Sequence, residues 1–165
     1  MTHSVAQGFG KDTSERIPLP ATEAMTAEQK AAAEALIAGP RKGVKGPFIP
    51  LMQSPELLNR MAIVGEYLRF DSVLPRQINE FVTLIVARET SNQFEWAIHY
   101  PLAMQAGVKE SLLQDMAAGA RPREMSAELA DAWNFTTELL QKHGVSDPTY
   151  AAAVERWNTQ GVIEL

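Results

Sequence analysis

The sequence contains no cysteine among its 165 residues. This absence excludes thiol catalysis, disulfide bonds and thiolate metal sites, whatever the compartment. The sequence also has no glycine-rich phosphate loop and no Gly-x-Ser-x-Gly nucleophile elbow. Its fifteen Lys and Arg residues are scattered, and the net charge is -5. We therefore expect no basic surface for nucleic acid.

Long apolar runs are missing as well. No uninterrupted apolar stretch approaches the roughly 20 residues that a helix needs to cross a bilayer. The first ten residues do not combine a basic segment with an apolar core. These absences predict a soluble cytoplasmic protein without a membrane partner.

Helix-start signals occur at several places in the chain. Thr26 and Gln29 fit a capping box, and Ser54 precedes a proline at a first helical position. Ser126 is placed to cap a long amphipathic segment. With the apolar periodicity, these signals predict six or seven helices and no strand, which is an all-α bundle.

The domain organisation follows from composition. Residues 1–25 are polar, include two prolines and show no sustained period. We expect them to form an extended N-terminal arm. Residues 26–165 are expected to form one all-helical domain, because a chain of this length suits a single core.

The most apolar helical segment runs from Pro75 to Glu89, and we expect it to be the central buried helix. Glu80 lies within it, between apolar neighbours. A carboxylate in such a place needs a partner or must be protonated. A salt bridge to Arg76, four residues earlier, is one explanation, and acid–base function is the other.

The segment from Glu89 to Gly107 combines polar groups with apolar and aromatic neighbours. Glu95 and His99 have the four-residue spacing that places two side chains on one face of a helix, and Asn92 falls on that face. Histidine titrates near neutral pH, so His99 is a candidate proton carrier that Glu95 orients. A pair with this spacing is as often a simple ion pair. As a metal site the group is weak, since it matches no Glu-x-x-His or His-Glu-x-x-His pattern, and we expect no metal or cofactor.

These residues resemble a known family. The patterns Pro-Arg-x3-Glu, ending at Glu80, and Phe-Glu-Trp-x2-His-x3-Ala-x3-Gly-Val, ending at Val108, are similar to those of the carboxymuconolactone decarboxylase family, which includes the alkylhydroperoxidase D-like proteins. The resemblance covers about residues 54–119. It implies an alkylhydroperoxidase D-like all-α fold.

The peroxidase branch of that family carries a glutamate nineteen positions before the histidine and a Cys-x-x-Cys pair seven and four positions before it. Carried onto this chain, the glutamate is Glu80 and the histidine is His99, while the cysteine positions hold Asn92 and Glu95. Without a thiol there is no peroxidatic nucleophile. Peroxidase activity is therefore the least expected reading.

The decarboxylase branch needs no thiol. The resemblance implies loss of carbon dioxide from a lactone acid without a cofactor, with His99 as general acid and Glu80 or Glu95 setting its protonation. A substrate carboxylate would be held by Arg76 or Arg88. The substrate-binding residues would also include Asn92 and Trp96. The partner is then a small lactone or carboxylic acid.

The family further implies a homo-oligomer (a dimer, trimer or hexamer), with sites near subunit boundaries. An alternative hypothesis is a non-catalytic member of the family that serves as an oligomeric binding or stress-associated protein. Under this hypothesis Glu80, Glu95 and His99 form only a satisfied polar network in the core. The two readings differ in whether a ligand-sized pocket reaches His99.

Overall fold

The computed structural model describes residues 16–165. Residues 1–15, which include His3 and most of the expected N-terminal arm, lie outside the described residues. The rest of that arm contains a short 3-10 helix, η1 (Thr22–Ala24). The chain divides into two compact units at Ile63 and Val64, within one helix. The expectation of a single domain over residues 26–165 stays a prediction.

The described part of the chain is all-α. It forms eight α-helices and a short π-helical segment besides η1, and it contains no strand. This confirms the predicted fold class. The count exceeds the expected six or seven because it includes a helix of only four residues, α2 (Phe48–Leu51).

The first unit is built around α1 (Ala27–Ala38), α2 and the start of α3 (Pro55–Glu66). The predicted capping box is present: the Thr26 hydroxyl accepts the Gln29 N–H, and the Gln29 side chain accepts the Thr26 N–H. The Gln29 amide also donates to the carbonyl of Met52 at 2.9 Å. A small apolar core surrounds these groups, made of Ala32, Ala33, Leu36, Phe48, Met52, Leu58 and Ala62.

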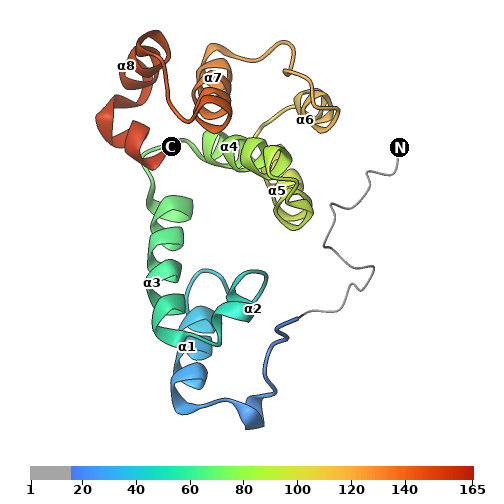
Figure 1. Cartoon of the computed structure of the whole chain (residues 1–165), viewed down its shortest axis with the longest axis vertical. Coiled ribbons are helices and arrows are strands. Elements are labelled where there is room, and N and C mark those ends of the chain that lie inside the picture. Colours follow the sequence, from blue (N-terminus) through green and yellow to red (C-terminus); the bar gives the residue numbers. More distant parts are fainter. Residues whose placement is uncertain (1–15) are drawn as a thin grey trace. The chain divides into compact units, whose positions relative to one another are not determined.

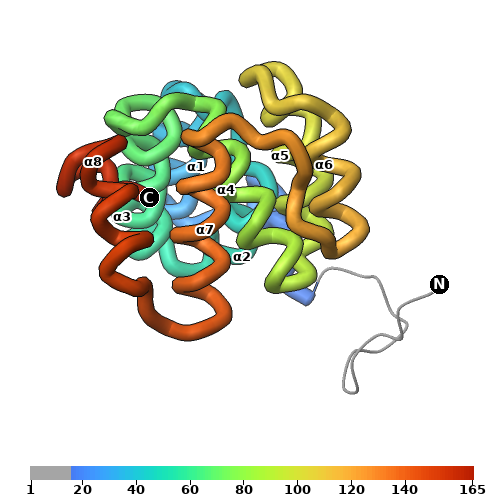
Figure 2. Tube along the Cα trace, turned by 90° about the horizontal axis from the view of Figure 1, so that it is seen from above, coloured from blue at the N-terminus to red at the C-terminus, as the bar shows by residue number. Residues whose placement is uncertain are grey.

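The second unit holds the segment of interest. It contains the π-helical η2 (Tyr67–Asp71), then α4 (Arg76–Glu89), α5 (Gln93–Gln105), α6 (Glu110–Ala117), α7 (Ala127–Lys142) and α8 (Asp147–Glu164). Helix α4 packs against α5, α6 and α7 (Figure 1). Helices α5 and α7 also lie beside α4 when the molecule is seen from above (Figure 2). The prediction of a central buried helix is confirmed.

Seven side chains of α4 are buried, and six of them are apolar: Ile78, Phe81, Val82, Leu84, Ile85 and Ala87. The seventh is Glu80. The apolar side chains join Leu112, Leu113 and Met116 of α6 and Trp157 of α8 in one core cluster. Burying this surface is the main stabilising term for the unit, and it fixes α4 as the rigid element that carries Glu80.

Helix α8 is interrupted near its end. The chain turns at Asn158 (φ 55°, ψ −178°), directly after Trp157, and continues in a helix to Glu164. The Asn158 side chain accepts the N–H groups of Gln160 at 2.8 Å and Gly161 at 3.3 Å. An asparagine in a left-handed conformation thus acts as an internal cap, which restarts the helix.

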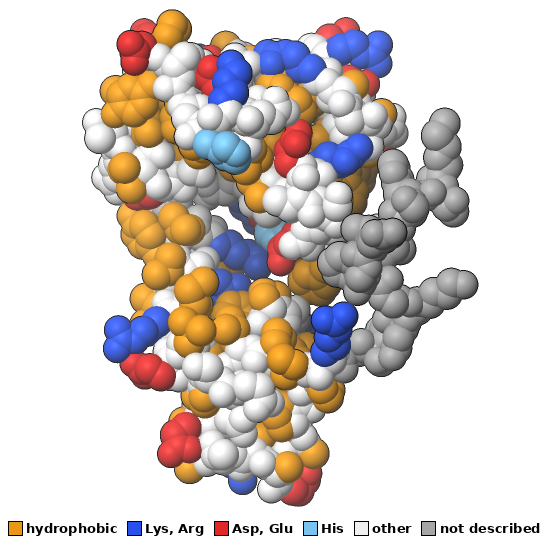
Figure 3. Space-filling view, viewed as in Figure 1, with side chains coloured by type: hydrophobic (Ala, Val, Ile, Leu, Met, Phe, Trp, Pro, Cys, Tyr) orange, Lys and Arg blue, Asp and Glu red, His pale blue; other side chains and the backbone are white. Residues whose placement is uncertain are grey.

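Helix α3 exposes several of its apolar side chains. The exposed fractions are 52% for Met61, 70% for Ile63 and 56% for Val64. Apolar side chains gather at the surface over this helix on the face seen in Figure 3. Among the described helices, none is long and apolar enough to cross a bilayer.

Candidate functional site

Glu80 of α4 and His99 of α5 contact each other directly. The Nδ1 atom of His99 lies 2.7 Å from Oε2 of Glu80, a hydrogen bond between residues nineteen positions apart. The Glu80 side chain is 5% exposed and that of His99 is 14% exposed. A carboxylate as buried as Glu80 needs a donor, and the Nδ1–H group of His99 supplies it.

Glu95 completes the group on the outer side. Its Oε2 atom lies 3.2 Å from Nε2 of His99, and its side chain is 29% exposed. The i, i+4 pairing predicted from sequence therefore forms. When Nδ1–H donates to Glu80, a neutral imidazole leaves a bare lone pair at Nε2, facing a carboxylate oxygen. One further proton must reside on Nε2 or on Glu95 for this contact to be attractive.

Arg76 lies at the buried end of the Glu80–His99–Glu95 trio. Its Nε atom is 3.9 Å from Oε1 of Glu80, and its side chain is 61% exposed. The salt bridge considered from sequence is thus long, and Glu80 makes its short contact with His99 instead. The guanidinium remains mostly at the surface, where it is accessible to a ligand.

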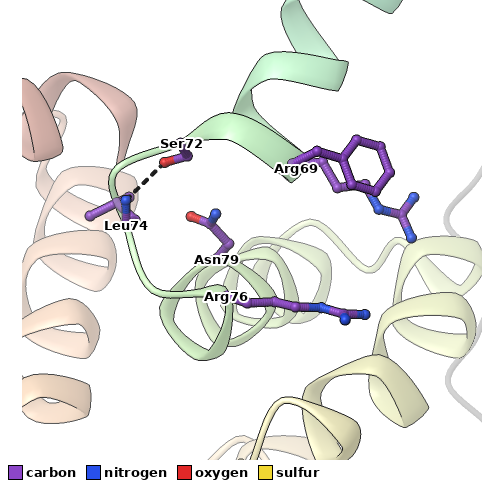
Figure 4. Close-up of a pocket in the computed structure, with 6 residues that line it drawn as sticks. Arg69, Ser72, Leu74, Arg76 and Asn79 are labelled. Carbon is purple, nitrogen blue, oxygen red and sulfur yellow. Dashed lines mark hydrogen bonds between the residues drawn. The ribbon is translucent and has the colours of Figure 1, made fainter. Parts of the chain in front are cut away.

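A hollow of about 280 Å³ opens beside Arg76. We call it the Arg76 hollow; it is lined by Arg69, Phe70, Ser72, Leu74, Arg76 and Asn79. Figure 4 shows the side chains of Arg69 and Arg76 extending in the same direction, one from η2 and one from the start of α4. Two guanidinium groups beside one hollow favour an anionic ligand.

The polar atoms of the hollow are held in place. The Asn79 amide donates to the carbonyl of Leu68 at 3.1 Å, and the Leu74 N–H donates to the Ser72 hydroxyl at 3.1 Å. The Arg69 guanidinium carbon lies 5.4 Å from the centroid of the Phe70 ring. These contacts restrict the side chains before any ligand arrives, which lowers the entropic cost of binding.

The other predicted substrate-binding residues are placed differently. Asn92 is exposed and caps α5, because its side chain accepts the N–H of Glu95 at 3.1 Å. Trp96 packs partly buried against the core, with its ring 5.8 Å from that of Tyr100. Burial raises the pKa of Tyr100, with a smaller contribution from the charge of Glu110.

Arg88 is not brought to the trio. It donates from Nε to the carbonyl of Ala117, at 3.2 Å, near the end of α6. A guanidinium in this position satisfies a terminal carbonyl of the helix. Arg88 lines a second hollow of about 370 Å³ with Glu89, Met116, Gly119, Arg121, Trp133 and Gln141.

His99 itself lines neither of these two hollows. The apolar residues beside it on α5 do not close over it either, since Phe94 and Ile98 are 49% and 44% exposed. In residues 16–165, no group of three or more His, Cys, Asp and Glu side chains could hold a metal ion. The connection from the Arg76 hollow to His99 therefore runs through Arg76 and Glu80.

Sequence reasoning missed Arg69, Ser72 and Asn79. They come from a short stretch that the sequence presents only as the end of one apolar stripe and the start of the next helix. Arg69 stands between apolar residues in Tyr-Leu-Arg-Phe, the one signal that marked it. Nothing in the sequence links this stretch to the end of α8, which it contacts in the fold.

The sequence was compared with profiles of known protein families. The profile of the carboxymuconolactone decarboxylase family matches residues 55–138, which include the trio and the Arg76 hollow and stop before α8. No curated protein and no solved structure matched the chain. The family match covers half of the sequence, and it agrees with the all-α fold. The chain belongs to the carboxymuconolactone decarboxylase family.

Proposed function

We propose that this protein is an enzyme that acts by general acid–base chemistry, without a cofactor, on a small lactone or carboxylic acid. The observation that carries the proposal is the continuous contact from Arg76 through Glu80 and His99 to Glu95. It combines a cation for a substrate carboxylate with a histidine held between two carboxylates. Such a combination suits a reaction in which an anion is bound and a proton is delivered.

Decarboxylation is the reaction we favour. The bond between carbon and the leaving carboxylate breaks, carbon dioxide departs, and the electron pair passes into the conjugated dienolate of the lactone. His99 then donates a proton to carbon, so that the net change is one proton consumed and one carbon dioxide released. Glu95, the most exposed of the trio, returns a proton from solvent to His99.

Glu80 and Arg76 serve orientation and binding in this proposal. Glu80 holds the imidazole ring of His99 in place through its contact with Nδ1. Arg76 pairs with the substrate carboxylate that remains after the reaction, beside Glu80. Asn92 and Trp96 contribute through the structure of α5 rather than through the Arg76 hollow, and Arg88 belongs to the second hollow.

A non-catalytic binding member is the second candidate. One observation favours it: the trio satisfies its own polar groups, and His99 does not line the Arg76 hollow. Hydroperoxidase activity ranks last, because the sequence has no cysteine to form a sulfenic acid or a disulfide.

We also propose that the protein is a homo-oligomer. Ile63 and Val64 of α3 are more than half exposed, and Leu68 and Phe70 of η2 are 37% and 49% exposed. Exposed apolar side chains that gather in a short stretch of chain are often covered by a partner. A second copy of the chain is the occupant we favour, as in the closed symmetric assemblies that most homo-oligomers form.

The deciding experiment follows the ultraviolet absorbance of 4-carboxymuconolactone and related lactone acids on addition of the full chain, with carbon dioxide release measured in parallel. Turnover that is abolished by His99→Asn and Glu80→Gln would support the proposal. His143→Asn is the matched control, because His143 is exposed at the end of α7 and takes no part in the trio. No turnover across the panel would reject decarboxylation and favour the binding member.

A further inference from the structure

One wall of the Arg76 hollow is tied to a residue far away in the sequence. The carboxylate of Glu164, at the end of α8, accepts hydrogen bonds from the Tyr67 hydroxyl at 2.6 Å and the Ser72 hydroxyl at 2.7 Å. It also accepts the backbone N–H of Val73 at 2.8 Å. Arg69 lies between these attachment points. Both ends of the segment that carries Arg69 are thus held by one carboxylate.

The Glu164 contacts are well developed. A fourth donor, the Gln160 side-chain amide, lies 2.8 Å from the same carboxylate. The Tyr67 hydroxyl is the largest cause, followed by Gln160 and Ser72, of the low pKa of Glu164, about 2. The carboxylate is therefore ionised at neutral pH, and hydrogen bonds to an ionised acceptor are stronger than neutral ones.

The segment needs such support. Residues Tyr67–Asp71 form a π-helix, a rare conformation that occurs mostly as single turns, frequently at functional sites. The kink at Asn158 directs the last turn of α8 to this segment. A Cβ atom placed on Gly161 would lie 3.3 Å from Cδ2 of Leu74, another lining residue of the hollow, so α8 and the segment before α4 are in close contact there.

We propose that Glu164 is a positioning residue for the Arg76 hollow. It holds the Tyr67–Val73 segment so that Arg69 and Arg76 together bind one anionic ligand. The identity of that ligand as a substrate carboxylate rests on the proposed function. Glu164 acts at a distance, through the segment, and does not line the hollow. It also lies outside the residues that the family profile matches.

Electrostatics and positioning predict opposite effects for one substitution. Glu164→Gln removes a negative charge from the neighbourhood of two arginines, and charge alone would then strengthen anion binding. The same change replaces one acceptor oxygen by an amide N–H₂ group, which cannot accept from Tyr67, Ser72 or Val73. If positioning dominates, anion binding weakens, so the sign of the effect separates the two roles.

The test uses succinate as a non-reacting dicarboxylate probe, titrated calorimetrically into the full chain. We expect Arg69→Gln, Arg76→Gln and Glu164→Gln each to weaken succinate binding about tenfold, the effect of losing one charge-assisted contact. The matched controls are Glu155→Gln and Arg123→Gln. Glu155 is exposed on α8 and Arg123 pairs with Asp115, so neither substitution should change the affinity for succinate. Unchanged or tighter binding by Glu164→Gln overturns the inference, as does failure of the wild type to bind succinate.

Tyr67→Phe provides a second variant if Glu164→Gln does not fold. It removes one hydroxyl donor, leaves the contacts to Ser72 and Val73, and should weaken succinate binding by a smaller factor. Binding without turnover separates the two proposals. If the variants weaken succinate binding but no lactone reacts, the anion site stands and the decarboxylase proposal fails. If lactones react and Glu164→Gln leaves both KM and succinate affinity unchanged, the positioning role fails alone.

Discussion

Glu80 and His99 meet across two helices, with Nδ1 of the histidine 2.7 Å from a carboxylate oxygen of the glutamate. Because an ionised carboxylate only accepts hydrogen bonds, the Nδ1 atom must carry a proton. We therefore expect ¹⁵N spectra of the side chains, recorded at neutral pH, to show Nδ1 of His99 protonated. His143, exposed at the end of α7, is the internal reference. A neutral ring protonated only at Nε2 would contradict this assignment.

Glu95 is expected to contribute to turnover rather than to folding. The Glu95→Gln side chain keeps its size and can donate to Nε2 of His99, but it cannot take up or release a proton. If Glu95 exchanges protons with solvent, kcat falls by about 10²–10⁴-fold, the usual contribution of a general acid or base. The midpoint of thermal unfolding should stay unchanged, and Glu155→Gln is the control. An unaltered kcat would assign Glu95 to a simple ion pair.

The stability of the second unit should fall in acid for an identifiable reason. Hydrogen bonds lower the pKa of Glu164 to about 2, chiefly from Tyr67, and the pKa of Glu138 to about 2, chiefly from the N–H of Ser146. Both pKa values lie below the ordinary 4.5. Their stabilising effect is therefore present above about pH 4.5 and is lost as the pH falls toward 2.

Urea unfolding measured from pH 7 to pH 2 checks this pH dependence. The difference in the free energy of unfolding between the wild type and Glu164→Gln should be largest at neutral pH and should shrink as the pH falls. The same holds for Glu138→Gln. A difference that does not change with pH would mean that neither carboxylate titrates as the hydrogen bonds require.

Local signals in the sequence were sufficient for most of the helices and for the pair of Glu95 with His99. Thr26 and Gln29 form the predicted capping box, and the i, i+4 spacing brings Glu95 to His99. The contact of Glu80 with His99 was accessible only through the family pattern, since it joins different helices. Such a pairing depends on how α4 packs against α5, which periodicity does not specify.

The remaining features depend on contacts between distant residues. The link from Tyr67 to Glu164 spans 97 positions, and no local pattern announces it. The sequence around Asn158 is typical of a helix end. In the structure this residue interrupts α8, and its side chain then caps the final turn of the same helix. Arg88 shares a helix with Arg76, yet it satisfies a carbonyl of α6. Propensity and spacing do not determine these tertiary choices.

The exposed face of α3 provides a test of assembly. An aspartate in place of Val64, which is 56% exposed, should cost little in an isolated chain but should oppose burial in an interface. We expect light scattering to show a smaller mass for Val64→Asp than for the wild type. Leu139→Asp, at a residue of α7 that is 46% exposed, is the control and should keep the wild-type mass. A monomeric wild type would remove the oligomer proposal.

We expect that Gly161 of α8 cannot be replaced by alanine without a loss of stability. A Cβ atom at this position would lie 2.4 Å from Cβ of Trp157, which the kink at Asn158 brings unusually close. Trp157 is 6% exposed and packed in the core, so it has little room to move. Gly161→Ala should therefore lower the free energy of unfolding by about 1–3 kcal/mol, the usual cost of overpacking.

Gly144→Ala is the matched substitution, because nothing lies within 4 Å of the added Cβ atom there. Its effect should stay within about 0.5 kcal/mol, as for most surface changes. Chemical unfolding of both variants measures the contrast, and equal effects would show that the last turn of α8 adapts without cost. If Gly161→Ala also weakens succinate binding while Gly144→Ala does not, the change in packing at the kink has displaced Glu164 and, through it, Arg69. That result would connect the packing of α8 to the anion site through a substitution that leaves Glu164 itself unchanged.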